Sequence, residues 1–169
     1  MNDQKIDLIK PGNESQPEFQ VIHKYVNIRL TFQCTKRKLT ELTQIKTSRD
    51  AYMCFLDSFE DGYIPLKEFF YIMALNRANR LLGICKISEG GIAGTYVDLR
   101  IIAKFLIDLQ ASSVILCHNH PSGNLKPSFY DIELTKKLRA GLQLFEMDVG
   151  DHIIITMDDY YSLSDNGQI

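Results

Sequence analysis

Short apolar runs bounded by polar residues predict the strands of this chain. The runs FFYIMAL at 69–75 and LLGICKI at 81–87 predict two strands, with residues 76–80 as their hairpin connection. SSVILCHNH at 112–120 and HIIIT at 152–156 predict two further strands, each too short for a helix of ordinary length.

Three other segments carry apolar residues three or four positions apart, which is the spacing of a helix that packs on one side. The first is 48–60, with Ser48 as the expected N-cap, and the second is 99–109, with Asp98 as its cap. The third begins at Ser128. Its apolar stripe consists of Leu134, Leu138, Leu142 and Phe145. Strands that alternate with helices predict an α/β domain of two or three layers.

The first part of the chain has a different character. Residues 1–20 are polar and contain Pro and Gly, which predicts a flexible N-terminal tail. The stretch FQVIHKYVNIRLTF at 19–32 is rich in β-branched and aromatic residues and predicts a strand or hairpin arm. We therefore divide the chain into a tail, a strand and basic segment at 21–47, and an α/β domain at 48–169.

A local excess of positive charge lies between residues 23 and 49, where Glu41 is the only acidic residue. The basic residues there are Lys24, Arg29, Lys36, Arg37, Lys38, Lys46 and Arg49. A solvated surface is the simpler interpretation, and a surface that binds nucleic acid or an acidic partner is the sharper alternative.

The composition narrows the class of protein. With 169 residues, 45% of them hydrophobic, the chain can build one core. Its 19 basic and 21 acidic residues create no overall field that attracts nucleic acid or a membrane. We find no signal peptide and no apolar run near the ~18 residues of a membrane span, so the expected location is cytoplasmic. The four cysteines form no C-x-x-C pair and are expected to be reduced, buried thiols.

Two histidines near the end of a predicted strand form the candidate site. His118 and His120 project to the same face of the strand, and Pro121 ends it. Seven residues rich in Pro, Ser, Gly and Asn then lead to Ser128, and Asp131 follows in the first turn of the next helix. The loop can therefore bring two imidazoles and one carboxylate together.

Two interpretations fit this pattern. Two histidine nitrogens and one carboxylate oxygen are the ligands of a catalytic zinc site, which keeps a fourth position open for water. Zinc lowers the pKa of water from about 15.7 to about 7. Ser128 and Asp131 also have the spacing of a capping box, and an acidic residue in the first turn suits the helix dipole.

The spacing His118-x-His120-x7-Ser128-x2-Asp131 matches the signature of JAMM (MPN+) metalloproteins. Together with HNHPSGN, Asp151-His152 and a closing Ser-x-x-Asp-x-Gly, the sequence from about 66 to 169 resembles the RadC branch of that superfamily, the RadC-like JAB domains. The resemblance implies a cytidine-deaminase-like α/β fold, with a mixed β-sheet flanked by helices. It makes His118, His120 and Asp131 ligands of Zn2+ and Ser128 a residue that stabilises the oxyanion.

The resemblance also implies a glutamate upstream of the histidines as general acid and base. Glu68, in LKEFFYIMALN, fits that position, and Glu89 is the fallback. Without the resemblance, Glu68 would be interpreted as a solvated acid at the start of a strand. Asp151 or His152 either orients a metal ligand or has a structural role at the start of HIIIT.

The function expected from these features is zinc-dependent hydrolysis of an amide bond in a peptide or isopeptide substrate. The resemblance to RadC-like proteins also implies an alternative, a nucleic-acid-binding protein associated with DNA repair. Many of these proteins carry an N-terminal helix-hairpin-helix region, and we find no recognisable version of it in this sequence. A third possibility is a non-catalytic MPN interaction module. A zinc deaminase is disfavoured because the H-x-E and P-C-x-x-C elements are absent.

Overall fold

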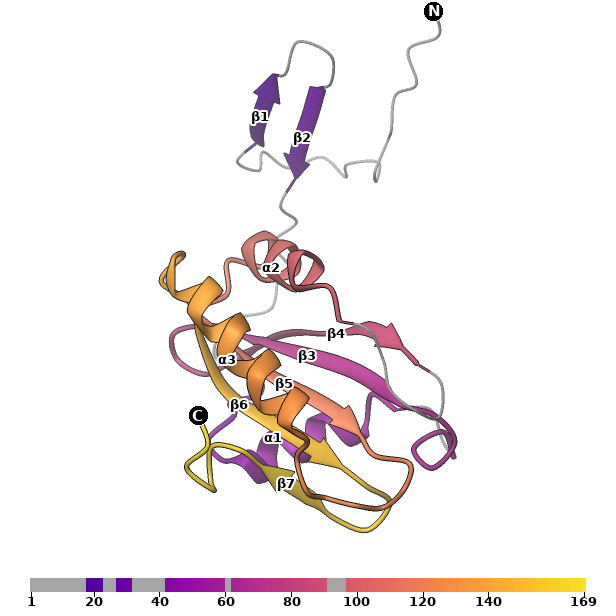
Figure 1. Cartoon of the computed structure of the whole chain (residues 1–169). Helices are drawn as coiled ribbons and strands as arrows, with labels where there is room; N and C mark the ends of the chain where they lie inside the picture. Colours follow the sequence, from indigo (N-terminus) through magenta and orange to yellow (C-terminus); the bar gives the residue numbers. More distant parts are fainter. Residues whose placement is uncertain (1–17, 23–26, 32–41, 60–61, 91–96) are drawn as a thin grey trace, which may run out of the picture. The chain divides into compact units, whose positions relative to one another are not determined.

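The computed structural model divides the chain into two compact units, Met1–Arg37 and Lys38–Ile169 (Figure 1). It describes residues 18–22, 27–31, 42–59, 62–90 and 97–169. In the first unit, β1 (Glu18–Ile22) and β2 (Asn27–Thr31) form an antiparallel hairpin, which confirms the strand predicted at 19–32. Residues 1–17 of the expected tail and most of the basic segment lie outside the described residues.

A five-stranded mixed sheet forms the centre of the second unit. Its order is β4 (Leu81–Glu89), β3 (Phe69–Leu75), β5 (Ser113–Asn119), β6 (Asp148–Ile155) and β7 (Tyr160–Ser162). Only β5 and β6 run parallel, and the other neighbours are antiparallel. The hairpin of β3 and β4 was predicted, although β4 extends two residues further; the short β7 was not, because three residues give no readable period.

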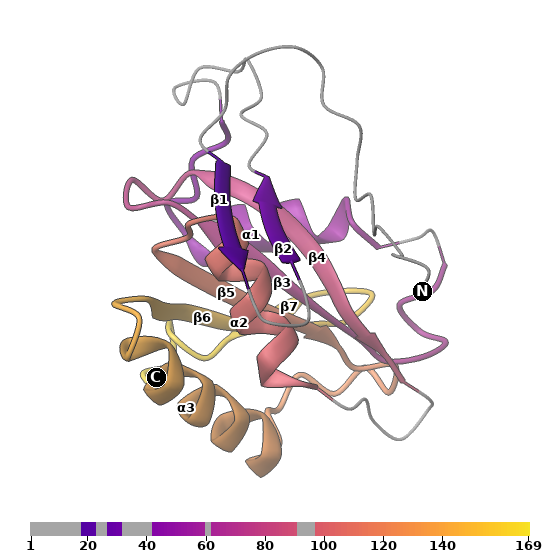
Figure 2. The ribbon, with the colours of Figure 1, turned by 90° about the horizontal axis from the view of Figure 1, so that it is seen from above.

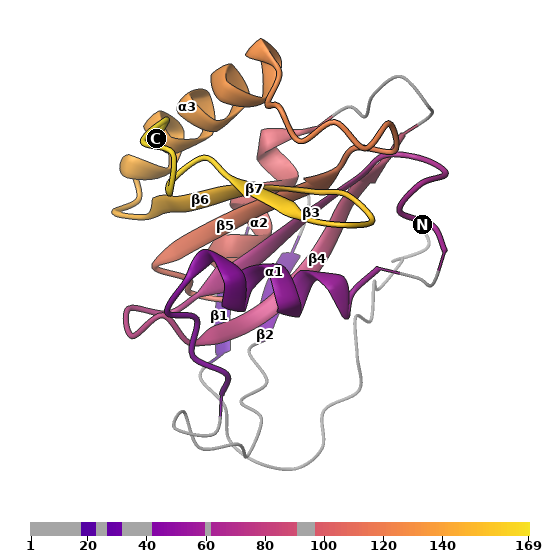
Figure 3. The same cartoon turned by 90° about the horizontal axis from the view of Figure 1, so that it is seen from below.

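Three helices cover the two faces of this sheet. α1 (Ser48–Leu56) packs on one face, which Figure 3 shows nearest the viewer, while α2 (Leu99–Asp108) and α3 (Phe129–Gln143) cover the other (Figure 2). The unit is therefore a three-layer α/β structure, one of the two layerings that the sequence allowed. Within the described residues, none of the helices has both the length and the apolarity needed to cross a membrane.

The side chains of β5 alternate between the two hydrophobic cores. Leu116 is buried among residues of α2 and α3, whereas Ile115 and Cys117 are buried in the core beneath α1. His118 therefore faces the α2 and α3 side, and its ring stacks on Phe70 of β3. Cys117 faces the opposite core, as expected, and burial raises the pKa of its thiol well above the usual value.

The cap of α1 corrects one prediction. Thr47, not Ser48, is the N-cap: its side chain accepts a hydrogen bond from the Asp50 amide, and Asp50 accepts one from the Thr47 amide in return. The reciprocal bonds of this capping box explain why the helix begins at Ser48, one residue earlier than a Ser48 cap requires. The helix ends at Leu56, four residues earlier than predicted.

We expect the substitution Leu116→Ala to lower the free energy of unfolding by about 2 to 5 kcal/mol, because it removes buried methyl groups and leaves a cavity in the central strand. Leu144→Ala is the matched control, since Leu144 is 84% exposed and its truncation should change stability by less than about 0.5 kcal/mol. Urea unfolding followed by circular dichroism measures both. Equal effects of the two substitutions would contradict the assignment of Leu116 to the core.

Candidate metal centre

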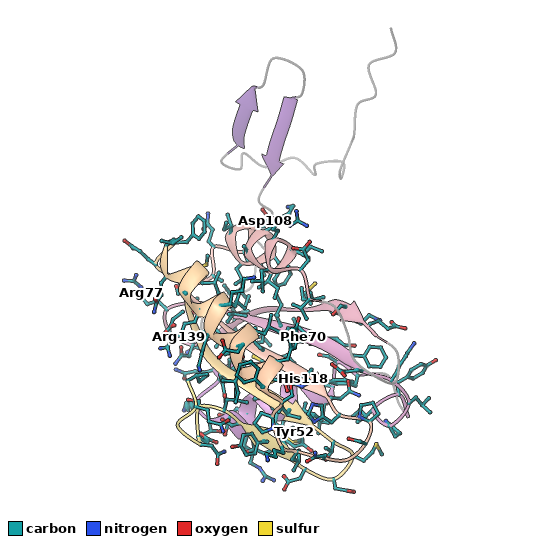
Figure 4. The ribbon with its side chains drawn as sticks, viewed as in Figure 1. Tyr52, Phe70, Arg77, Asp108, His118 and Arg139 are labelled. Atoms are coloured by element: carbon teal, nitrogen blue, oxygen red, sulfur yellow. The ribbon has the colours of Figure 1, made fainter. Side chains whose placement is uncertain are left out.

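The end of β5 and the beginning of α3 bring His118, His120 and Asp131 together, as the sequence predicted. The two histidine Nε2 atoms lie 2.9 Å apart. His118 Nε2 lies 3.3 Å from Asp131 Oδ1, and His120 Nε2 lies 4.0 Å from Asp131 Oδ2. Figure 4 shows the labelled His118 between the sheet and α3, close to Phe70. Among the described residues, this is the only group of three or more His, Cys, Asp or Glu side chains whose possible ligand atoms lie close together.

These separations fit one small metal ion. Zinc binds histidine nitrogen and carboxylate oxygen at about 2.0 to 2.2 Å, so two tetrahedral ligands lie roughly 3.3 to 3.5 Å apart. The two histidine nitrogens are 2.9 Å apart, and His118 Nε2 is 3.3 Å from Asp131 Oδ1, so both distances lie close to that range. The His118 side chain is only 2% exposed, whereas those of His120 and Asp131 are 17% and 11% exposed. Solvent can therefore reach the centre from the side of His120 and Asp131.

The loop after β5 fixes the orientation of His120. The Gly123 amide donates a hydrogen bond to the His120 carbonyl (3.0 Å), and Gly123 has a φ of 76°, a conformation that favours glycine. The turn carries the Asn124 carbonyl back to 2.5 Å from His120 Nδ1. Because a carbonyl only accepts, Nδ1 is the nitrogen that holds the proton, and Nε2 keeps its lone pair for a metal.

His118 is held by buried neighbours. Its Nδ1 lies 2.8 Å from Nε2 of His152 on β6, and Phe70 stacks on its other side. Burial lowers the pKa of His118 to about 4, even though the Asp131 carboxylate opposes the change. Burial also lowers the pKa of His152 well below its usual value. Both imidazoles are therefore neutral at pH 7, the form that a metal ligand requires.

Of the two residues whose role the sequence left open, His152 contacts a ligand and Asp151 does not. Asp151 Oδ2 accepts a hydrogen bond from the Ser162 hydroxyl (2.6 Å), and its Oδ1 accepts from the Ser164 amide (3.0 Å). Asp151 therefore ties the segment after β7 to β6, while burial raises the pKa of its carboxyl.

Ser128 and Asp131 satisfy both interpretations of their spacing. The Ser128 amide and hydroxyl donate to Asp131 Oδ2 at 2.7 and 2.6 Å, and the Asp131 amide donates to the Ser128 hydroxyl at 3.1 Å. This is a complete capping box at the start of α3. Asp131 Oδ1, the oxygen nearer His118, accepts none of these hydrogen bonds, so the cap leaves this oxygen available to a metal ion.

Comparison with known proteins agrees with this geometry. Residues 45–168 match the family model of the RadC-like JAB domain. This chain belongs to that family. The resemblance to the JAMM superfamily is thus confirmed over nearly all of the second unit.

Relatives of this RadC-like JAB domain are bacterial proteins named UPF0758. The protein from Flavobacterium johnsoniae is 37% identical over 148 residues, which cover 85% of this chain and 63% of the relative. Those from Porphyromonas gingivalis and Fusobacterium nucleatum are 31% and 37% identical over 83% and 79% of this chain. The chain spans about three fifths of the length of these relatives.

The strand register of the RadC-like JAB domain bears on the two candidate glutamates. Phe70 of β3 pairs with His118, and Glu68 directly precedes the first residue of β3, so Glu68 lies at the end of the sheet that carries the histidines. Glu89 pairs with Phe69, so its side chain belongs to the face of the sheet opposite that of Phe70 and His118. There it forms ion pairs with two lysines, Lys67 and Lys86, which lower the pKa of its carboxyl.

Asn119, the residue between the two histidines, holds the segment that carries Glu68. Its Oδ1 accepts a hydrogen bond from the Phe69 amide (2.7 Å), and its Nδ2 donates to the carbonyls of Lys67 (2.8 Å) and Ile64 (2.7 Å). The peptide groups on both sides of Glu68 are thus tied to the strand that carries the ligands. We had not predicted this role, because it depends on a partner fifty residues away in the sequence.

We expect the zinc-free domain to lose stability as the pH falls from about 6.5 to about 4. Buried His118 and His152 resist protonation in the folded chain, whereas the unfolded chain binds protons near pH 6.5. The full stability is present above the unfolded pKa, and each histidine removes up to about 1.4 kcal/mol per pH unit below it.

Urea unfolding with a chelator present, repeated at closely spaced pH values, measures this dependence. The variant His118→Gln should show a shallower fall, because one of the two titrating groups is gone. A free energy of unfolding that stays constant through this pH window in the unmodified protein would contradict the neutral, buried state of both rings.

Proposed function

We propose that this RadC-like JAB domain is a zinc-dependent hydrolase that cleaves an amide bond in a peptide or isopeptide substrate. The observation that carries the proposal is the convergence of His118, His120 and Asp131, at zinc-ligand separations, beside a solvent-accessible side. The position of Glu68 directly before β3, at the end of the sheet that carries the histidines, supports a hydrolytic role rather than a purely structural metal site.

In this proposal, the two imidazoles and the Asp131 carboxylate hold the ion. When bound, zinc supplies Lewis acidity, which lowers the pKa of water and polarises a carbonyl group. The Glu68 carboxylate takes a proton from the attacking water and delivers it to the nitrogen of the leaving amine. A carbon–oxygen bond forms and the carbon–nitrogen bond breaks, which yields a carboxylate and an amine.

Ser128 and Asn119 assist this reaction in different ways. The Ser128 hydroxyl is a donor for the oxyanion, although it must first turn away from Asp131 Oδ2, to which it donates in the resting site. Asn119 keeps the backbone beside Glu68 in register with the ligands through its three hydrogen bonds. Proton transfer requires such control, because a general base acts only within hydrogen-bonding distance.

The first test is metal content. The purified protein should hold about one zinc per chain, and His118→Ala and Asp131→Ala should abolish that binding, because a tetrahedral site loses one of its three protein ligands. Asp158→Ala is the control for Asp131→Ala, since Asp158 is exposed and lies in the turn before β7. Elemental analysis after dialysis measures the stoichiometry. Zinc at the unmodified level in either ligand variant would show that the site is misassigned.

The second test separates proton transfer from metal binding. Glu68→Gln should retain zinc and lose about 10²- to 10⁴-fold in turnover, because the amide cannot carry the proton. Glu89→Gln is the matched control, since Glu89 lies on the face of the sheet opposite that of His118. Turnover is measured on mixtures of peptides and of lysine-linked isopeptides, with His118→Ala as the blank. If the zinc-loaded protein cleaves nothing beyond that blank, the hydrolase proposal fails.

A further inference from the structure

Three buried side-chain contacts connect two of the candidate metal ligands by a route that avoids the metal itself. His118 Nδ1 lies 2.8 Å from His152 Nε2, and His152 Nδ1 lies 2.6 Å from the Thr135 hydroxyl. That hydroxyl donates to the backbone carbonyl of Asp131 at 2.6 Å. The series therefore leaves the metal centre at one ligand and returns to it at another.

The backbone carbonyl of Asp131, at one end of this chain of hydrogen bonds, fixes the direction of every bond in it. A carbonyl oxygen only accepts, so the single hydroxyl proton of Thr135 is used on Asp131. The Thr135 oxygen can then only accept from its other neighbour, which places a proton on Nδ1 of His152. A neutral imidazole carries one proton, so His152 Nε2 accepts from His118, and His118 carries its proton on Nδ1.

This direction exposes the lone pair of His118 Nε2 to His120 and Asp131, as a metal ligand requires. The opposite tautomer of His118 would place a bare Nδ1 against a bare His152 Nε2. His118, His152 and Thr135 are all buried, so solvent cannot readily repair such a mismatch. An unsatisfied buried polar group costs about 1 to 3 kcal/mol. The selected tautomer instead turns the bare Nε2 atom of His118 toward that of His120, 2.9 Å away, on the side of the centre that solvent reaches, so the mismatch is avoided where water cannot enter.

We propose that Thr135 and His152 are positioning residues of the metal centre, and that the Thr135 hydroxyl selects the tautomer in which His118 presents Nε2 to the ion. The inference rests on the metal site of the proposed function and not on the hydrolytic step. Thr135 lies four residues after Asp131 on α3, on the same side of the helix. One helix thus provides a ligand and also sets the tautomer of a second ligand on β5.

The substitution pair Thr135→Val and Thr135→Ser tests the inference. Valine keeps the shape and removes the hydroxyl, whereas serine keeps the hydroxyl. Zinc affinity is measured on the full chain by competition with a chromophoric chelator at constant pH. Thr135→Val should weaken zinc binding by about 10- to 100-fold, as is typical when a partner behind a ligand is removed. Thr135→Ser should bind zinc nearly as tightly as the unmodified protein.

Thr156→Val is the control for the loss of a buried hydroxyl. Thr156 is 3% exposed and donates to the Asp159 carbonyl, but its hydroxyl contacts none of the three ligands. It should leave zinc affinity unchanged. Thermal unfolding without metal separates a change in affinity from a change in fold. Unchanged zinc affinity in a folded Thr135→Val protein would overturn the inference.

A second measurement does not depend on any variant. Long-range proton–nitrogen correlation spectra of the zinc-free, unmodified protein report which ring nitrogen carries the proton. We expect Nδ1–H for both His118 and His152, and a spectrum with Nε2–H on His118 would overturn the inference even if Thr135→Val does not fold. A protein that binds zinc but cleaves no amide would remove the proposed function and leave this inference standing.

Discussion

The alternation of side chains along β5 is the constraint on which the candidate site depends. Because the strand lies between β3 and β6, its register is held on both edges, and one face packs against α2 and α3 while the other packs beneath α1. A slip of one residue would exchange the two faces. His118 would then leave the metal centre, and the buried thiol of Cys117 would take its place.

The start of α3 shows how one pair of residues serves stability and chemistry together. The Ser128 and Asp131 capping box satisfies amides that the first turn of the helix would leave unpaired. The same box holds the Asp131 carboxylate still, with Oδ1 on the side of His118. The spacing in the sequence could not decide between a cap and a metal ligand, because one carboxylate can cap the helix with Oδ2 and still turn Oδ1 toward His118.

Local periodicity predicted much of the fold, and the motif spacing predicted the three candidate ligands. Short-range sequence patterns predicted the strands of the β3–β4 hairpin. They also predicted the N-cap at Asp98 and the helix after Ser128. Glu68 was suggested only by the family resemblance, and the structure has it directly before β3, at the end of the sheet that carries the histidines. Its part in proton transfer stays a prediction.

The contacts that sequence reasoning missed join distant residues. His118 and His152 are separated by 34 positions, and Thr135 and His152 by 17, so no local pattern reports them. A clue to Thr135 existed, because it lies one helical turn beyond Asp131, but a threonine at that spacing is common in any helix. The Thr135 hydroxyl reaches His152 only because α3 packs against β6.

Asn119 has a consequence for anyone who would graft this site onto another scaffold. The motif His-x-His allows any residue at its middle position. In this protein that residue is Asn119, whose side chain forms hydrogen bonds with the peptide groups on either side of Glu68. A transplant of the two imidazoles and the aspartate alone would move the candidate ligands and lose the hydrogen bonds that hold the segment of Glu68 beside them. The smallest part of the site that could be transferred is therefore the end of β5 together with the start of β3, with the Asn119 side chain that joins them.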